Sequence, residues 1–515
     1  MKTKALLWLS FCLWLCACNQ PQITDTLPRS IPEKEGVSSQ GILNFIEAVE
    51  QSGQEWHSFM LLRHGKVIAE GWWDPFRSDL RHMMYSTSKT FTSTAIGFAV
   101  SEGRLSVDDK VISFFPEQLP DTVSPNLEAL RVKDLLCMAV GHDPEPFDII
   151  GETNWVKAFL STPVVNEPGT KFLYNSLATY MLSAIIQKVT GEKLIDYLTP
   201  RLFEPLAIEG ADWEDDPEGI NTGGWGLRIK TKDMAKLGQL YLQKGQWNGK
   251  QLIPVQWIEE ATSAKIMQKP DISQEQKEKD DWAQGYCYQI WRCRNNAFRA
   301  DGAFGQYIIV MPEQDAVLAV TANVNNMQEE INLVWDYLLP AIQQAPVSSD
   351  KKAEAALRQK LSSLAIQPSV GVISTMETEL ANETSYCLDT GHVKAFSFRF
   401  ENDVCHAIIR GSKDDFPLVF GRETWIAGET RKPGSNLVPS NITGFSTIFK
   451  VRGSYCWKDE QTLILTLRYI EGPHYETVTC RFEDDLVHIE TTSDINRKLT
   501  MMTGKLMIDN YSLRS

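Results

Sequence analysis

The chain has 515 residues, 43% of them hydrophobic, and a formal net charge of −15 from 51 Lys and Arg against 66 Asp and Glu. This length allows a full hydrophobic core and more than one domain. The negative charge repels a phosphate backbone, and no basic run compensates for it, so nucleic acid is excluded as an expected partner.

The first residues have the pattern of a secretory signal. Lys2 and Lys4 precede an apolar run over 5–15 that is too short to span a bilayer. The run ends in Leu15-Cys16-Ala17-Cys18, which resembles a bacterial lipobox, where cleavage before the last Cys leaves its thiol to carry lipid. A buried N-terminal helix is the alternative, but the basic start and the polar stretch over 19–28 argue against it.

We therefore expect a signal peptide over 1–18, lipidation at Cys18 and a membrane as partner through that anchor. The expected location is the cell envelope, on the periplasmic side. Asn19 follows Cys18 where an aspartate is associated with inner-membrane retention, which favours the outer membrane.

The cysteines and histidines predict no metal site and no cofactor. The cysteine spacings match no zinc pattern, and the eight histidines contain no His-Glu-x-x-His arrangement. Besides Cys18, an odd number of cysteines remains, so at least one is expected to stay unpaired and all are expected to be structural. They are Cys137, Cys287, Cys293, Cys387, Cys405, Cys456 and Cys480.

Taken in chain order, residues 30–345 predict a domain in which strands bracket a helix-rich middle. A helix over 41–50 comes first, and strands over 59–62 and 67–69 follow it. Further helices are expected at 87–103, 131–139, 177–189, 231–244 and 254–262, and strands at 285–292, 305–311 and 316–323. An amphipathic stretch over 331–342 is expected to pack back on the sheet.

The chain turns polar over 346–368, which we interpret as a linker leading into a short helix. Residues 369–515 alternate apolar and polar side chains between turn sequences, as in Leu463-Ile464-Leu465-Thr466-Leu467. This pattern predicts an antiparallel all-β module, either a barrel such as a lipocalin-like one or a sandwich.

Ser86 and Lys89 form the pattern that carries chemistry. They stand one turn apart at the start of the helix predicted over 87–103, so both side chains share a face. A serine hydroxyl needs a base to take its proton, and a desolvated lysine can be neutral enough to do so. The tetrad alone is weak, because Ser-x-x-Lys also occurs at Ser348 and Ser349 in the predicted linker, where solvated charges are the better interpretation.

The order of further blocks resembles a family. After Ser86 come Val132-Lys133-Asp134-Leu135-Leu136, Pro168-Gly169-Thr170-Lys171 with Tyr174-Asn175-Ser176, and then Gly223-Gly224-Trp225-Gly226-Leu227. The chain over about 30–345 is similar to serine hydrolases related to class C β-lactamases, D-alanyl carboxypeptidases, esterases and nylon-oligomer amidases. The resemblance implies an α/β fold of the β-lactamase and transpeptidase type, with an antiparallel sheet flanked by helices and a helical subdomain.

The resemblance also implies roles for the second block. Tyr174 falls where the family has a tyrosine that shares or relays the proton of the nucleophile, and Ser176 falls where substrate amides are bound. A phenol beside a lysine ammonium loses its proton more easily than in water, so Lys89 and Tyr174 are expected to titrate as a coupled pair. A buried, merely satisfied Tyr is the alternative.

The third block is Ala300-Asp301-Gly302, and the resemblance implies that it contacts substrate. The backbone N–H groups of Ser86 and Ala303 would form the oxyanion hole. The family's lysine is missing at Ala300, and alternation should turn the neighbouring Arg299 to the opposite face. The family blocks end before Pro346, so the site is expected to be complete without residues 369–515.

The expected function is therefore a serine hydrolase that forms an acyl-enzyme on a small ester or amide, with D-amino-acid peptides as one candidate class. A penicillin-binding receptor or sensor that acylates without turnover is the second hypothesis. A lipid-anchored binding protein that works through its C-terminal barrel is the third, and the joint presence of Ser86, Lys89 and Tyr174 argues against it.

Overall fold

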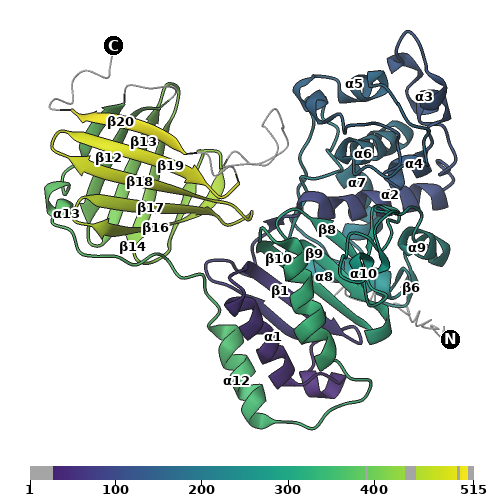
Figure 1. The fold of residues 1–515 in the computed structure, drawn as a ribbon, viewed down its shortest axis with the longest axis horizontal. Helices are drawn as coiled ribbons and strands as arrows, with labels where there is room; N and C mark the ends of the chain where they lie inside the picture. The colour runs from purple at the N-terminus through teal and green to yellow at the C-terminus, as the bar shows by residue number, and fades with distance from the viewer. Residues whose placement is uncertain (1–26, 389–392, 435–447, 496–498, 508–515) are drawn as a thin grey trace, which may run out of the picture.

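The computed structural model describes residues 27–388, 393–434, 448–495 and 499–507. They form a hydrolase-like domain of sheet and helices and a β-barrel beside it (Figure 1). The predicted signal peptide and Cys18 lie outside the described residues. Within these ranges, no helix is long and apolar enough to cross a membrane.

The first domain is built on one antiparallel sheet of six strands. Alternate residues of its strands face two separate hydrophobic cores, as Met60 and Phe59 do on neighbouring positions of one strand. In spatial order the strands are β2 (Lys66–Trp72), β1 (Glu55–Arg63), β10 (Ala316–Asn323), β9 (Gln306–Met311), β8 (Phe298–Gly302) and β7 (Trp291–Arg292).

Helices cover both faces of this sheet. On one face lie α1 (Ser39–Gln51) and α11 (Met327–Leu333), which continues into a π-helical turn over Val334–Leu338. On the other face lie α2 (Ser88–Ser101) and α8 (Thr231–Leu242). This arrangement confirms the predicted fold class and the predicted packing of the stretch over 331–342.

A helical lobe stands beyond α2 (Figure 1). Its longest helix, α6 (Ser176–Thr190), packs against α2 and α4, which brings the second sequence block next to the first. The other helices of the domain are α3 (Pro125–Ala129), α4 (Val132–Leu136), α5 (Trp155–Ser161), α7 (Leu194–Leu198), α9 (Val255–Thr262) and α10 (Gln274–Lys277). The helices predicted over 87–103, 177–189, 231–244 and 254–262 agree with the observed bounds. Only Val132–Leu136 of the helix expected over 131–139 and only Trp291–Arg292 of the strand expected over 285–292 form, and α3, α5, α7 and α10 were not predicted.

The segment over 346–368 contains a helix that belongs to the first domain's surface. This helix, α12 (Lys351–Ser362), packs on α1, and its Leu357 is buried in the same core. After it, Asp74 and Ala365 form a β-bridge. The segment that leads to the C-terminal module therefore packs against the first domain along most of its length.

The C-terminal module is a barrel of nine strands, with β15 added outside the ring. An up-and-down ring with an odd number of strands must contain one parallel pair, and here β14 and β16 supply it through Gly421 with Ser454 and Arg422 with Tyr455. A short helix, α13 (Met376–Glu379), precedes the strands. They are β11 (Thr384–Leu388), β12 (Val393–Glu401), β13 (Val404–Gly411), β14 (Asp415–Arg422), β15 (Ile426–Thr430), β16 (Phe449–Asp459), β17 (Thr462–Tyr469), β18 (Tyr475–Glu483), β19 (Leu486–Ser493) and β20 (Thr500–Leu506).

The barrel interior is packed with its own side chains. Aromatic rings dominate this core, and they contact one another at centroid distances such as 5.6 Å between Phe398 and Phe482. Two cysteines, Cys405 and Cys480, are buried in the same core. The seven cysteines within the described ranges are all free thiols.

Candidate active site

Ser86 lies in a 3₁₀ turn, Tyr85–Thr87, that leads directly into α2. The preceding residue, Tyr85, has a φ of 46°, in the left-handed region that non-glycine residues rarely occupy. Such conformations persist where the surrounding structure enforces them, and they are common at active sites. The turn presents the Ser86 side chain at the start of the helix.

Lys89 is the residue that contacts Ser86 from one turn further along α2. Its Nζ lies 3.1 Å from Ser86 Oγ, 3.2 Å from Ser176 Oγ and 2.6 Å from the carbonyl oxygen of Gly224. The side chain is 2% exposed. The predicted spacing of Ser86 and Lys89 therefore produces direct contact.

These three contacts suit a neutral amine. A neutral lysine has two N–H groups and one lone pair. The Gly224 carbonyl can only accept a hydrogen bond and Ser176 Oγ can accept the second, which leaves the lone pair for the hydroxyl proton of Ser86. Burial lowers the pKa of Lys89 to about 7, while the nearby carboxyls of Glu145 and Asp301 act in the opposite direction. Lys89 is thus placed to act as a base near neutral pH.

A pH dependence follows from the Lys89 pKa. Only the neutral amine can take the Ser86 proton, so kcat/KM for a neutral ester should rise about tenfold per pH unit up to about pH 7 and then level off. The measurement is kcat/KM between about pH 5 and pH 9, with circular dichroism at each pH to show that the fold is kept. A midpoint above about pH 9 would contradict a neutral lysine at physiological pH.

Tyr174 closes the other side of this pair. The Ser86 side chain is close enough to the phenol to lower its pKa in part, and Lys89 Nζ lies 5.0 Å from the ring centroid. The ring is stacked on Trp291 at 5.6 Å. Burial raises the pKa of Tyr174 far above its usual range. The expectation of an acidified phenol is therefore wrong, because desolvation of the phenolate outweighs the opposing effects of Ser86 and Arg299, and the carboxyls of Asp301 and Glu145 raise the pKa further.

Ser176 is the first residue of α6, and Asn175 caps that helix by accepting a hydrogen bond from the N–H of Ala178 at 3.0 Å. The cap holds the Ser176 hydroxyl toward Lys89. The backbone N–H of Ser176 donates to Glu145 Oε1. Glu145 of the helical lobe therefore contacts the backbone of Ser176 and also acts on the pKa of Lys89.

The end of strand β8 lies against the turn that carries Ser86. A side chain at Gly302 would place its Cβ 2.3 Å from the carbonyl oxygen of Met84, so only glycine permits this approach. The Thr87 hydroxyl donates to the carbonyl of Gln306 at 2.6 Å and ties the same two segments together. Gly302 is followed by a tight turn, in which Ala303 is half-buried and Phe304 has a φ of 64°.

The third block faces two directions. Ala300 is 4% exposed and lies in the apolar core under α2 and α8, where Leu237 and Ile308 surround the same small internal cavity. This corrects the expectation that Ala300 contacts substrate, because its methyl group points into the core. We leave it out of the proposed site.

Arg299 and Asp301 lie on the opposite face of β8 from Ala300, as strand alternation predicts. Arg299 Nε donates to Asp301 Oδ2 at 2.9 Å, and Nη1 donates to the carbonyl of Asp281 at 2.9 Å. The guanidinium is fully buried and lies 4.4 Å from the centroid of Trp282. Strand β8 thus contains a cation, Arg299, but this cation is paired with Asp301 of the same strand.

Sequence reasoning assigned no role to Gly224 or Glu145. The double glycine at 223–224 was part of a block, and the reason for it is close packing, since a Cβ at Gly224 would lie 2.5 Å from the carbonyl oxygen of Ser176. Glu145 stands in a loop without any recognisable motif. His82 lies in a buried pair with His57 and makes no contact with Ser86 among the hydrogen bonds described.

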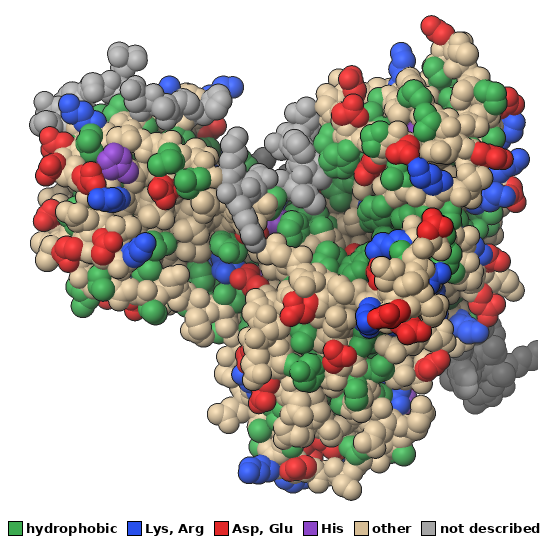
Figure 2. Space-filling view, viewed as in Figure 1, with side chains coloured by type: hydrophobic (Ala, Val, Ile, Leu, Met, Phe, Trp, Pro, Cys, Tyr) green, Lys and Arg blue, Asp and Glu red, His purple; other side chains and the backbone are tan. Residues whose placement is uncertain are grey.

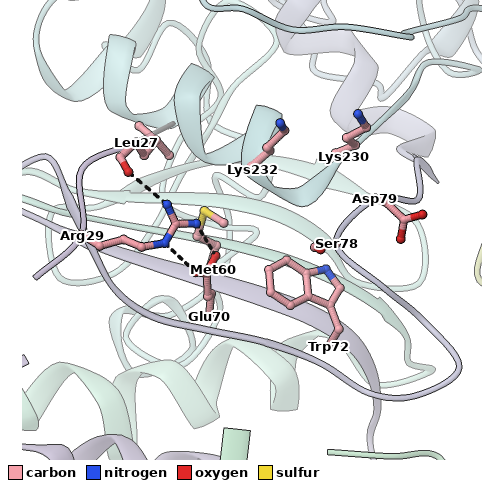
Figure 3. A pocket seen from close by; sticks show the side chains of 9 residues that line it. All are labelled: Leu27, Arg29, Met60, Glu70, Trp72, Ser78, Asp79, Lys230 and Lys232. Carbon is pink, nitrogen blue, oxygen red and sulfur yellow. Dashed lines mark hydrogen bonds and ion pairs between the residues drawn. The ribbon is translucent and has the colours of Figure 1, made fainter. Parts of the chain in front are cut away.

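A separate open hollow of about 330 Å³ is lined by other residues, including Trp72, Lys230 and Lys232 (Figure 3). Arg29 crosses it and donates to Glu70 and to the carbonyl of Leu27. It contains none of the groups around Ser86. No group of three side chains suited to a metal ion is found within the described ranges.

Comparisons with known proteins agree with this geometry. The beta-lactamase family model matches residues 46–341. A 6-aminohexanoate-dimer hydrolase of Paenarthrobacter ureafaciens is 24% identical over 283 residues, which cover 51% of this chain and 71% of that protein. A "Putative D-alanyl-D-alanine carboxypeptidase" of Escherichia coli is 22% identical over 238 residues, and the match spans about half of its length, 54%, and 40% of this chain.

Among solved structures, the "Putative 6-aminohexanoate-dimer hydrolase from Bacillus anthracis" is similar with a TM-score of 0.51 and 20% identity, covering 62% of this chain and 89% of that one. This likeness shows the fold alone. Because the family model covers more than half of the chain, the chain belongs to the beta-lactamase family. It is a hydrolase-family protein with a C-terminal barrel beyond the matched region.

Proposed function

We propose that the protein is a serine hydrolase that forms an acyl-enzyme on Ser86 with small esters or amides that lack a carboxylate beside the scissile bond. The observation that carries this proposal is the 3.1 Å contact between Ser86 Oγ and the buried Nζ of Lys89. A serine paired with a lysine of lowered pKa is an activated nucleophile.

In the proposed reaction, Ser86 Oγ attacks the carbonyl carbon while its proton passes to Lys89 Nζ. The developing oxyanion is held by the backbone N–H groups of Ser86 and Ala303, each worth about 3 to 4 kcal/mol in such sites. The neutral phenol of Tyr174 donates a proton to the leaving group and regains one from Lys89. Water then attacks the acyl carbon with Lys89 again as base, which releases the acid and restores the Ser86 hydroxyl.

The charges around the site support a preference for uncharged substrates. Glu145 and Asp301 are close enough to Lys89 to oppose the lowering of its pKa, so the site already contains carboxyl groups. Arg299, the cation of strand β8, is paired with Asp301 and buried. No partner for a substrate carboxylate is therefore evident among the described residues of β8.

We expect hydrolysis of short p-nitrophenyl acyl esters and weak or absent turnover of nitrocefin. A charged hydrogen bond to the β-lactam carboxylate is worth about 1.5 to 3 kcal/mol, so its absence should lower β-lactam reactivity roughly ten- to a hundredfold. Both substrates are assayed with one protein preparation lacking residues 1–18, with Ser86→Ala as the blank. Efficient nitrocefin hydrolysis with untouched esters would refute the proposed specificity.

The same experiment separates an enzyme from an acylating receptor. Intact mass after treatment with a fluorophosphonate counts the adducts, and loss of the adduct in Ser86→Ala assigns it to Ser86. The time course with an ester distinguishes a burst followed by steady turnover from a single stoichiometric burst. The amide panel should include the 6-aminohexanoate dimer and D-alanyl-D-alanine, the compounds in the names of the two relatives. D-alanyl-D-alanine has a carboxylate beside its scissile amide, so the proposal expects it to react weakly or not at all.

We also propose that Cys18 carries lipid and holds the protein at a membrane of the cell envelope, on the periplasmic side. The basis is the sequence over 1–18, with its basic start, short apolar run and lipobox-like end. Fractionation of cells that express Cys18→Ser tests this proposal. The variant should leave the membrane fraction, and its retention there would contradict a lipid anchor at Cys18.

A further inference from the structure

The barrel reaches the active site through the loop between β17 and β18. The carbonyl of Glu471 in this loop accepts a hydrogen bond from the N–H of Met83 at 3.0 Å, just before the turn that carries the nucleophile. The Glu471 carboxylate also binds Arg81 at 3.2 Å. In Figure 1 the barrel lies next to the sheet end where β8 and β10 are seen. These contacts fix the loop beside Ser86.

The last residue of this loop, His474, contacts both segments that form the proposed oxyanion hole. Its Nε2 is hydrogen-bonded to the Tyr85 hydroxyl, and Tyr85 immediately precedes Ser86. Its ring lies edge-on to Phe304 with centroids 4.8 Å apart, and Phe304 immediately follows Ala303. Tyr85 and Phe304 also contact each other at 5.5 Å. The His474 imidazole thus contacts both Tyr85 and Phe304, the residues next to the two proposed oxyanion-hole donors.

Both neighbours have backbones that need support. Tyr85 and Phe304 have φ angles of 46° and 64°, in the left-handed region that residues with a side chain rarely adopt. The direction of an N–H group depends on the backbone angles next to it. The peptide that carries the Ser86 N–H follows Tyr85 directly. Phe304 lies in the turn closed by the 3.2 Å hydrogen bond from the Gly305 N–H to the Gly302 carbonyl, and Ala303 lies in the same turn. Side-chain contacts that keep Tyr85 and Phe304 in these conformations therefore hold the two segments that carry the N–H groups of Ser86 and Ala303.

His474 is itself held firmly. It is 5% exposed, and its Nδ1 lies 2.7 Å from Asp494 Oδ2. The same carboxylate oxygen accepts a hydrogen bond from Asn323 of strand β10 at 2.9 Å, so both domains share it. The Asp494 carboxylate can only accept a hydrogen bond, so Nδ1 carries a proton toward it, and Nε2 is the ring atom that contacts the Tyr85 hydroxyl.

We propose that His474 is a positioning residue for the hydrolase reaction, which holds the oxyanion-hole backbone at Ser86 and Ala303 through Tyr85 and Phe304. The barrel is then part of the working enzyme rather than an appended module. This inference rests on the proposed acyl-enzyme function. It also replaces the expectation that the site is complete without residues 369–515.

The test measures kcat, KM and the pH midpoint of p-nitrophenyl ester hydrolysis in the full protein lacking only residues 1–18. His474→Ala should lower kcat about 10- to 100-fold, since small misplacements and lost oxyanion donors have effects of this size or larger. KM should stay within about twofold, because the oxyanion hole acts on the transition state. The pH midpoint should stay near 7, because Lys89 remains buried.

Two further variants separate positioning from general loosening of the domains. His474→Gln keeps an acceptor for the Tyr85 hydroxyl and should recover part of the lost kcat. Trp425→Phe removes another contact between barrel and linker, the 2.8 Å hydrogen bond to the carbonyl of Ile366, and should behave as wild type. A rise in the pH midpoint or in KM that matches the loss of kcat would instead indicate that the cleft has opened to water.

If His474→Ala does not fold, Tyr85→Phe decides the question, because it removes only the Tyr85 hydroxyl that is hydrogen-bonded to His474 Nε2. Wild-type kcat in folded His474→Ala or in Tyr85→Phe would overturn the proposal. If wild-type protein hydrolyses no ester, it is the proposed function that fails. The rate of fluorophosphonate labelling at Ser86, compared across the same variants by intact mass, then tests His474 on its own.

Discussion

Replacement of Ser86 by alanine should abolish ester turnover, with kcat reduced by about 10⁴-fold or more, since loss of a serine nucleophile typically costs this much or more. The fold should be kept within about 1 kcal/mol, because the hydroxyl caps no helix and Lys89 retains Ser176 and Gly224 as partners. Steady-state kinetics and thermal unfolding of the same preparation measure both effects.

Ser93→Ala is the matched control for this substitution. Ser93 lies in the same helix and is fully buried, and its hydroxyl has no hydrogen-bond partner in the described part of the chain. The identical chemical change at this position should leave kcat unchanged. Activity retained in Ser86→Ala above the level of a buffer blank would refute the assignment of the nucleophile.

Lys89→Met and Tyr174→Phe should each lower kcat about 10²- to 10⁴-fold, the range typical of general acid and base groups. Their losses should not multiply, because both residues lie beside the Ser86 hydroxyl: Nζ lies 3.1 Å from its Oγ and 5.0 Å from the Tyr174 ring centroid, and Ser86 acts on the Tyr174 pKa. The double variant should therefore be about as slow as the slower single variant. Kinetics of the four proteins form one double-mutant cycle.

Tyr180→Phe is the control for the loss of a phenol hydroxyl. Tyr180 lies in α6, four residues after Ser176, and its hydroxyl donates to Asp216 Oδ2 at 2.7 Å rather than to Ser86 or Lys89. Its loss should lower stability without changing the pH midpoint of the reaction. If the effects of Lys89→Met and Tyr174→Phe multiplied as independent changes, the shared proton-transfer unit would be wrong.

Local spacing predicted much of this site. Ser86 and Lys89 are three positions apart at a helix start, and the helix repeat alone brings them to one face, as the 3.1 Å contact shows. Tyr174 and Ser176 were found through ordered blocks, and α6 carries Ser176 to 3.2 Å from Lys89. Alternation along β8 correctly separated Arg299 from Ala300.

The protonation states could not be predicted in the same way. The expected direction of the Tyr174 pKa shift and the expected contact of Ala300 with substrate were both wrong, because both depend on what surrounds the residue after folding. Burial sets the pKa of Lys89 near 7, and burial also keeps Tyr174 protonated. Desolvation is a property of the packed environment, which no spacing in the sequence records.

The sequence by itself therefore determined the longer helices and most of the central strands of the first domain, the β character of the second and the pair Ser86 and Lys89, since these follow from short-range periodicity and chain composition. Only the tertiary structure decided that His474, which is 389 positions from Tyr85 along the chain, contacts the nucleophile's turn. It also decided that Gly224 supplies the carbonyl for Lys89. Such contacts arise because burial of apolar surface brings distant segments together, and their polar groups must then find partners in the folded protein.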